Sequence, residues 1–136
     1  MRRREFVILS AASLVVPGAV WAGTTSYKPG LAREELAAGQ TVFLDFTATW
    51  CSTCAAQSRV IEALKAENAA YEQNVSFIDV DWDIYGNREL SRSLNIPRRS
   101  TLVVLQGDQE LGRTVAGTSR KVIKNLMDIA LGAAMA

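Results

Sequence analysis

The chain has 136 residues, which is enough for one domain and too few for two. Its net charge is +1, and beyond the first four positions the basic residues adjoin one another only in two pairs, Arg98-Arg99 and Arg120-Lys121. This pattern lacks the basic stripe of a nucleic-acid-binding protein, so no nucleic-acid partner is expected. The chain contains two cysteines and no histidine, which excludes the common zinc sites.

Residues 1–22 have the features of an export signal peptide. A positive segment of three arginines precedes an uncharged, mostly apolar stretch at residues 6–16. Ala22 and Val20 are small or tolerated residues at the positions that define a cleavage after Ala22. We therefore expect cleavage there, leaving one mature domain, residues 23–136. Its net charge is about −1, because the signal carries three arginines and one glutamate.

Two alternatives for this segment stay open. If it is not cleaved, residues 6–22 would anchor the chain, although they number fewer than the roughly 20 apolar residues that span a bilayer. The run Arg3-Arg4-Glu5-Phe6 also resembles a twin-arginine export signal, but Arg2 stands where Ser or Thr is usual. Every route leads out of the cytoplasm, so we expect a periplasmic location.

The chain beyond the signal begins with a short helix and a strand. The pattern predicts the helix over residues 31–38, ended by Gly39. Residues 41–46 are apolar or β-branched apart from Asp45, which predicts a strand covered on both faces. Apolar residues at helical spacing then predict a long helix over residues 55–69.

The second half continues this alternation. It predicts a strand at 75–80, a helix at 88–94, a hairpin of strands at 101–105 and 111–115, and a last helix capped by Thr118 or Ser119. Strands that alternate with helices indicate a three-layer α/β fold. We expect a central mixed sheet whose first strands are parallel, with the antiparallel hairpin at one edge and helices on both faces.

The two cysteines lie between the first of these strands and the long helix, in Trp50-Cys51-Ser52-Thr53-Cys54. At the start of a helix, unpaired N–H groups and the macrodipole stabilise a thiolate, so the pKa of Cys51 should be low. The thiolate is the species that attacks a disulfide, and Cys54, about one turn further on, can then attack the mixed disulfide. The spacing therefore predicts thiol–disulfide exchange.

Other uses of the pair fit less well. A structural disulfide would close a loop of a few residues and restrict the unfolded chain little. A zinc site needs two further ligands, and a haem-attachment site needs histidine where Ala55 stands. Without histidine, Asp45 is the candidate for accepting the Cys54 proton, because burial would raise its pKa. The alternative is a carboxylate at the edge of the strand that reaches water.

Residues 42–54 (VFLDFTATWCSTC) resemble the active-site segment of the thioredoxin superfamily. In element order the resemblance covers roughly residues 31–131, and it implies a thioredoxin-like fold whose first strand is missing or shortened. It assigns the attacking cysteine to Cys51, the resolving cysteine to Cys54, the buried acid to Asp45, and substrate-binding positions to Trp50 and Gly117.

The chain departs from the family in two places. Ser52-Thr53 is neither the Gly-Pro of general thioredoxins nor the Pro-His of strong oxidants. The family also has a cis-proline before a Thr-Leu strand. An ungapped match on Thr101-Leu102 places Ser100 at that position, whereas Pro97 reaches it only with a three-residue insertion. We favour Ser100 as a third substrate-binding position and expect Ser100→Pro to fold with altered activity.

Together these features predict a periplasmic disulfide reductase that acts on disulfide-containing exported proteins. Reduction is favoured because the dipeptide lacks the histidine of strong oxidants. The resemblance implies a membrane protein as the electron donor; we expect a monomer with no metal and no cofactor. The alternative is a non-enzymatic thioredoxin-like binding module whose CxxC pair is redox-inert or binds an iron–sulfur cluster, as relatives without the cis-proline sometimes do.

Overall fold

The computed structural model describes residues 23–136, and the expected export signal lies outside them. The elements in chain order are β1 (Thr25–Ser26), α1 (Leu31–Ala37), β2 (Thr41–Thr47), α2 (Ser52–Glu67), α3 (Ala70–Asn74), β3 (Val75–Asp81), α4 (Trp82–Tyr85), α5 (Glu89–Ser93), β4 (Thr101–Gln106), β5 (Gln109–Val115) and α6 (Arg120–Met135). Every predicted helix and strand is present, and α3 and α4 are additional. No helix in this part of the chain is long and apolar enough to cross a membrane.

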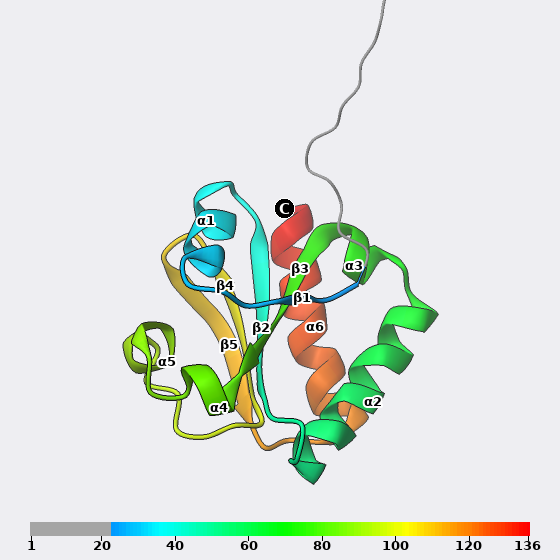
Figure 1. The fold of residues 1–136 in the computed structure, drawn as a ribbon. Helices are drawn as coiled ribbons and strands as arrows, with labels where there is room; N and C mark the ends of the chain where they lie inside the picture. The colour runs from blue at the N-terminus through cyan, green and yellow to red at the C-terminus, as the bar shows by residue number, and fades with distance from the viewer. Residues whose placement is uncertain (1–22) are drawn as a thin grey trace, which may run out of the picture.

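The five strands form one mixed sheet in the order β1-β3-β2-β4-β5. β1, β3 and β2 are parallel, β4 is antiparallel to β2, and β4 and β5 form the edge hairpin. Figure 1 shows the sheet between two groups of helices, with α1 and α5 on one side and α2, α3 and α6 on the other. The predicted three-layer fold is therefore confirmed, with a first strand shortened to two residues.

Each face of the sheet has its own hydrophobic core, which explains why β2 reads as an almost continuous apolar run. Phe43 points toward α2, α3 and α6 and packs with Phe77 at a ring-centroid distance of 5.1 Å. Val42, Leu44 and Phe46 alternate with it and point toward α1, α4 and α5. Asp45 shares the face of Phe43, so its carboxylate lies under α2 and α6 rather than in solvent.

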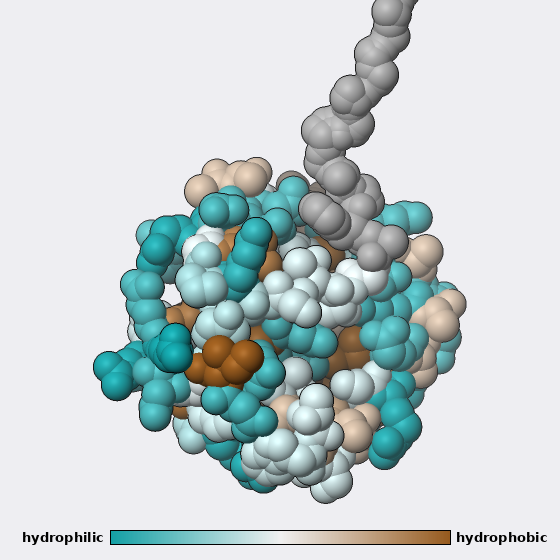
Figure 2. All heavy atoms as spheres, in the orientation of Figure 1, coloured by the Kyte–Doolittle hydropathy of each residue, from teal (hydrophilic) through white to brown (hydrophobic). Residues whose placement is uncertain are grey.

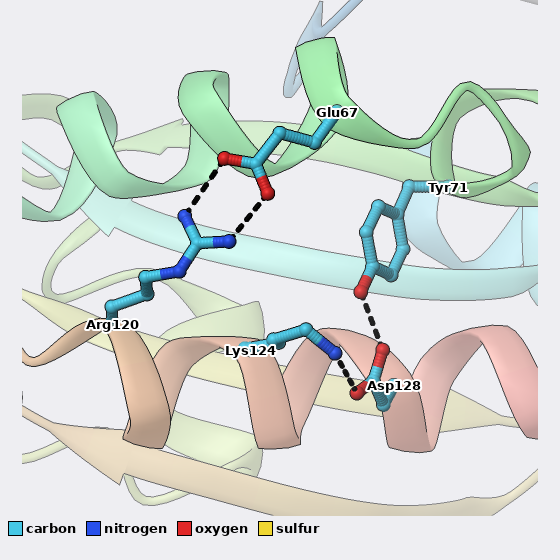
Figure 3. A network of polar contacts seen from close by, with 5 residues as sticks. All are labelled: Glu67, Tyr71, Arg120, Lys124 and Asp128. Carbon is cyan, nitrogen blue, oxygen red and sulfur yellow. Dashed lines mark hydrogen bonds and ion pairs between the residues drawn. The ribbon is translucent and has the colours of Figure 1, made fainter.

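Polar contacts fix α6 against α2 and α3 (Figure 3). Arg120 of α6 forms a two-pronged ion pair with Glu67 of α2, with Nη1 donating to Oε2 at 3.0 Å and Nη2 to Oε1. The buried Tyr71 of α3 donates its hydroxyl to Asp128, which also accepts from Lys124 at 2.9 Å. Exposed ion pairs add little stability. The network mainly sets the direction of α6.

Most of the surface that Figure 2 shows is polar, and the hydrophobic side chains on this face lie in small separate patches. Trp50, immediately before the first cysteine, is one of the most exposed large side chains, with 60% of its surface accessible. It lies at the N-terminal end of α2, which Figure 1 places at the end of the molecule opposite the C-terminus.

Candidate active site

The two cysteines lie where β2 passes into α2. Cys51 is the N-cap of the helix, with φ −97° and ψ 114°, and its sulfur accepts a hydrogen bond from the Cys54 N–H at 3.1 Å. The helix therefore begins at Ser52, three residues before the predicted start, because a cysteine sulfur takes the place of the usual oxygen cap. The predicted position of Cys51 at a helix N-terminus is confirmed.

Ser100 brings a third side chain between the two sulfurs. Its Oγ lies 3.2 Å from the Cys51 Sγ and 3.1 Å from the Cys54 Sγ. Pro97 is exposed, and no peptide bond within residues 23–136 is cis. The structure thus places Ser100, and not Pro97, against the sulfurs, as the ungapped match predicts.

The backbone of Ser100 overturns our expectation for Ser100→Pro. The residue has a φ of 67°, in the left-handed region, and its N–H donates to the Phe46 carbonyl at 2.7 Å. Proline locks φ near −65° and has no N–H, so it fits neither feature. The substitution should unfold or distort this loop rather than produce an ordinary thioredoxin site.

Several donors surround the Cys51 sulfur and lower its pKa from 9.0 to about 6. Burial acts in the opposite direction, since Cys51 is only 4% exposed and an ion there is less well hydrated. Hydrogen bonds from the Cys54 thiol, the Ser100 hydroxyl, the Cys54 N–H and the Arg99 side chain outweigh it. At neutral pH the thiolate of Cys51 is therefore favoured over the thiol.

Asp45 is buried, with 6% of its surface exposed, and is not a carboxylate at the edge of the sheet. Its Oδ1 has no hydrogen-bond partner within the described residues, and Asp45 lines a cavity of about 40 Å³ together with Lys65 and Asp79. The pKa of Asp45 is raised to about 8, mainly by burial and also by the Asp79 and Cys51 charges, while Lys65 acts in the opposite direction. No hydrogen bond joins it directly to either sulfur in this part of the chain, so a proton passing between them needs a water.

Trp50 and Gly117 flank the site in different ways. The Trp50 indole N–H donates to both carboxylate oxygens of Asp83, at 3.0 and 3.1 Å, which fixes the exposed ring. A Cβ at Gly117 would lie 2.7 Å from the Thr114 Oγ1, so packing alone requires glycine there. The expected part of both residues in substrate binding stays a prediction.

Gln57 is a site residue that the sequence analysis missed. It is fully buried on α2, and its Nε2 donates to the Ser100 carbonyl at 3.0 Å and to the Gly117 carbonyl at 2.9 Å. It thereby ties together the loops that precede β4 and α6. The sequence did contain one indication that Gln57 is buried. It is a polar residue three positions after Cys54, on the same face of α2 as the buried Ile61 and Leu64.

Cys51 and Cys54 are both free thiols, and the arrangement is suited to exchange with a disulfide. Within residues 23–136, no group of three or more histidine, cysteine, aspartate or glutamate side chains could hold a metal ion. A low-pKa cysteine at a helix start, a second cysteine one turn on and a parallel-then-antiparallel sheet define a thioredoxin-like α/β protein.

The comparisons with known proteins identify the family. The thioredoxin family profile matches residues 27–129, and the chain belongs to the thioredoxin family. The chloroplastic thioredoxin-like protein CITRX of Oryza sativa subsp. indica is 34% identical over 100 residues, covering 70% of this chain. This chain spans only about half, 50%, of the length of that rice protein.

Two further comparisons agree. A thioredoxin of Mycobacterium tuberculosis is 28% identical over 99 residues, covering 72% of this chain and 81% of its own. The crystal structure of Trxlp from Edwardsiella tarda matches with a TM-score of 0.66 and 23% identity, covering 76% of this chain and 98% of its own, and supports the fold. Family membership together with the Cys51/Cys54 pair supports thiol–disulfide oxidoreductase activity in general.

Proposed function

We propose that this protein is a protein-disulfide reductase that acts outside the cytoplasm on disulfides of exported proteins. The observation that carries the proposal is the Cys51 sulfur, which caps α2, has a pKa of about 6 and shares the Ser100 hydroxyl with Cys54. A thiol that is ionised at neutral pH and adjoins a resolving thiol supplies both steps of exchange.

The reaction transfers two electrons from the protein dithiol to the substrate. The Cys51 thiolate attacks one sulfur of the substrate disulfide, that S–S bond breaks, and the other substrate sulfur leaves and takes a proton from water. Cys54 then loses its proton and attacks the Cys51 sulfur. The mixed disulfide breaks, the second substrate thiol leaves, and the protein holds a Cys51–Cys54 disulfide.

Asp45 is the proposed acceptor of the Cys54 proton. With a pKa of about 8 it is mostly protonated at rest, and the Cys51 charge is one cause of that high value. Formation of the mixed disulfide removes this charge and so lowers the pKa of Asp45. More of the Asp45 carboxyl is then ionised and able to accept a proton at the step that needs a base. Asp45 also lines a cavity of about 40 Å³, which is large enough for a water to which the carboxyl can pass the proton on.

Ser100 serves both steps because one hydroxyl reaches both sulfurs. A hydroxyl carries a single proton, so it can donate to only one sulfur at a time. In the resting dithiol it donates to the Cys51 thiolate. Once Cys51 is bonded to the substrate, the hydroxyl is free to turn to Cys54, where the next thiolate forms.

The reductase direction is supported by the acidity of Cys51. Attacking cysteines of CxxC pairs have pKa values from about 3.5 in strong oxidants to about 7 in reductants. The value of about 6 is nearer to the reductants. A reductase outside the cytoplasm needs a supply of electrons, and we propose a membrane protein that carries them from the cytoplasm.

The test is reduction of insulin disulfides with dithiothreitol as electron source. The wild type should accelerate the reaction, Cys51→Ser should abolish the acceleration, and Cys54→Ser should accumulate a mixed disulfide visible by mass spectrometry. The redox potential of the pair should lie nearer about −270 mV than −120 mV. No acceleration by the wild type would instead favour a binding module with an inert CxxC, and full activity in Cys51→Ser would refute Cys51 as the attacking cysteine.

Export is tested separately. Expressed with its natural N-terminus in a bacterium, the protein should be recovered from the periplasm as a chain that begins at Gly23. A full-length chain in the membrane fraction would indicate an anchor, and a full-length chain in the cytoplasm would contradict export.

A further inference from the structure

Two arginines lie beside the attacking cysteine. The sequence analysis assigned no role to this basic pair. Arg98 and Arg99 immediately precede Ser100, and both are half-buried. The guanidinium carbon of Arg99 lies 4.5 Å from the centroid of the Trp50 ring. The Arg99 side chain is also one of the groups that lower the pKa of the Cys51 thiol.

The loop that carries these arginines is held firmly. The Arg98 Nε donates to the Arg99 carbonyl at 2.9 Å, and its Nη2 lies 3.4 Å from the Ser100 Oγ. The Thr101 hydroxyl donates to the Arg98 carbonyl at 2.7 Å. The two positive charges therefore keep their positions next to the sulfurs before any substrate arrives.

These charges lack acidic partners within residues 23–136. Three other arginines pair with glutamates: Arg33 with Glu89, Arg113 with Glu110 and Arg120 with Glu67. Neither Arg98 nor Arg99 has such a pair, and the Arg99 Nε is buried without a hydrogen-bond partner in the described chain. A partly desolvated guanidinium without a counterion favours the arrival of an anion.

Two exposed acidic groups lie on the α4 side of the site. Asp83 accepts the Trp50 indole N–H, and the Asp81 carboxylate caps α4 by accepting the Asp83 N–H at 2.9 Å. Trp50 thus lies between the negative charges of α4 and the positive charge of Arg99. A disulfide that approaches Cys51 meets Ser100 and the arginines on the positive side.

We propose that Arg98 and Arg99 form an anion-binding edge of the active site, which selects disulfides that carry a carboxylate close to the sulfur. The inference rests on the proposed exchange activity and names its substrate class, disulfides flanked by acidic groups. Guanidinium groups suit this task because they bind carboxylates through parallel N–H bonds and stay charged at every relevant pH.

The competing explanation is that Arg99 acts only on the Cys51 thiolate. In that case its removal would slow reactions with all disulfides by the same factor. An anion-binding edge instead changes the ratio between substrates of different charge. The ratio separates the two explanations, since it does not depend on how much thiolate is present.

The test uses three small symmetric disulfides: dithiodipropionate, which is anionic, hydroxyethyl disulfide, which is neutral, and cystamine, which is cationic. Each rate constant with the reduced protein is divided by the rate constant of the same disulfide with dithiothreitol, because the leaving thiols differ in reactivity. The normalised rate should be about tenfold higher for the anionic than for the neutral disulfide, and lowest for cystamine. Added salt should shrink this preference.

Single and double substitutions to glutamine at Arg98 and Arg99 should remove the preference. Arg99→Lys should keep most of it, and Arg92→Gln, on the exposed surface of α5, is the matched control that should keep all of it. Equal normalised rates in the wild type, or equal loss for all three disulfides in the glutamine variants, would overturn the inference alone. No reaction with any of the three would overturn the exchange activity as well.

Discussion

Asp45→Asn provides a quantitative test of the buried acid. The pKa of Asp45 is raised from 3.8 to about 8 in the folded protein, chiefly by burial and also by the Asp79 charge. Between these values the folded chain holds a proton that the unfolded chain has released, so stability falls as pH rises. Each pH unit corresponds to about 1.4 kcal/mol, which gives a loss of about 4 kcal/mol by pH 7 and about 6 kcal/mol above pH 8.

Asparagine cannot ionise, so the variant should lack this slope. Urea unfolding at about pH 5, 7 and 9 should show the variant gaining on the wild type by about 1.4 kcal/mol per unit until pH 8. Its mixed disulfide should form at the normal rate and resolve slowly, because the amide accepts no proton. A stability difference that does not change with pH would refute the buried, protonated carboxyl.

Asp128→Asn is the control of opposite sign. Partial burial raises the pKa of Asp128, but hydrogen bonds from Tyr71 and Lys124 outweigh it and lower the pKa. The contribution of that carboxylate to stability is present above the unfolded pKa and is lost as pH falls. The two aspartates should therefore shift the pH dependence of unfolding in opposite directions.

Two further substitutions test the loops around the sulfurs. Ser100→Gly should raise the pKa of Cys51 and slow its alkylation by iodoacetamide at neutral pH, while Ser93→Ala should not. The unfolding free energy of Ser100→Gly should change by less than about 1 kcal/mol, because relief of the positive φ offsets the freedom gained by the unfolded chain. Gly117→Ala should cost about 1–3 kcal/mol through the clash of its Cβ. Gly132→Ala, whose Cβ would meet nothing within 4 Å, should stabilise α6, and equal effects of the two alanines would contradict the packing argument.

The fold was predictable because its strands are buried on both faces or paired in a hairpin. β2 and β4 are runs of valine, leucine and phenylalanine that leave few alternatives. The two helices that the analysis missed, α3 and α4, have 5 and 4 residues and are too short to show a helical period. The predicted start of α2 was too late because it was taken from the spacing of apolar residues, and the N-cap at Cys51 is not part of that pattern.

The site was predictable only as far as residue chemistry follows from spacing. Cys51, Cys54 and Asp45 stand in one short run, so their proximity needed no tertiary information. Ser100 comes from a distant segment, and only the family resemblance placed it at the site. Its left-handed backbone is unusual for a serine, and nothing local in the sequence indicated that conformation. Gln57 was missed because a polar residue on a helix is more often exposed.

The strained backbone of Ser100 is held by its surroundings, and this explains how a serine can occupy the place of the family's proline. Its N–H donates to the Phe46 carbonyl, and its own carbonyl accepts from the Ala116 N–H at 2.8 Å and from Gln57. With every main-chain group engaged, the residue can hold a φ that costs an unsupported side chain about 1–2 kcal/mol. The same bonds direct its hydroxyl to both sulfurs. A proline ring fits neither this φ nor the bond to Phe46, and it could not donate a proton to a thiolate, so the low pKa of Cys51 here depends in part on a hydroxyl held in place by its neighbours.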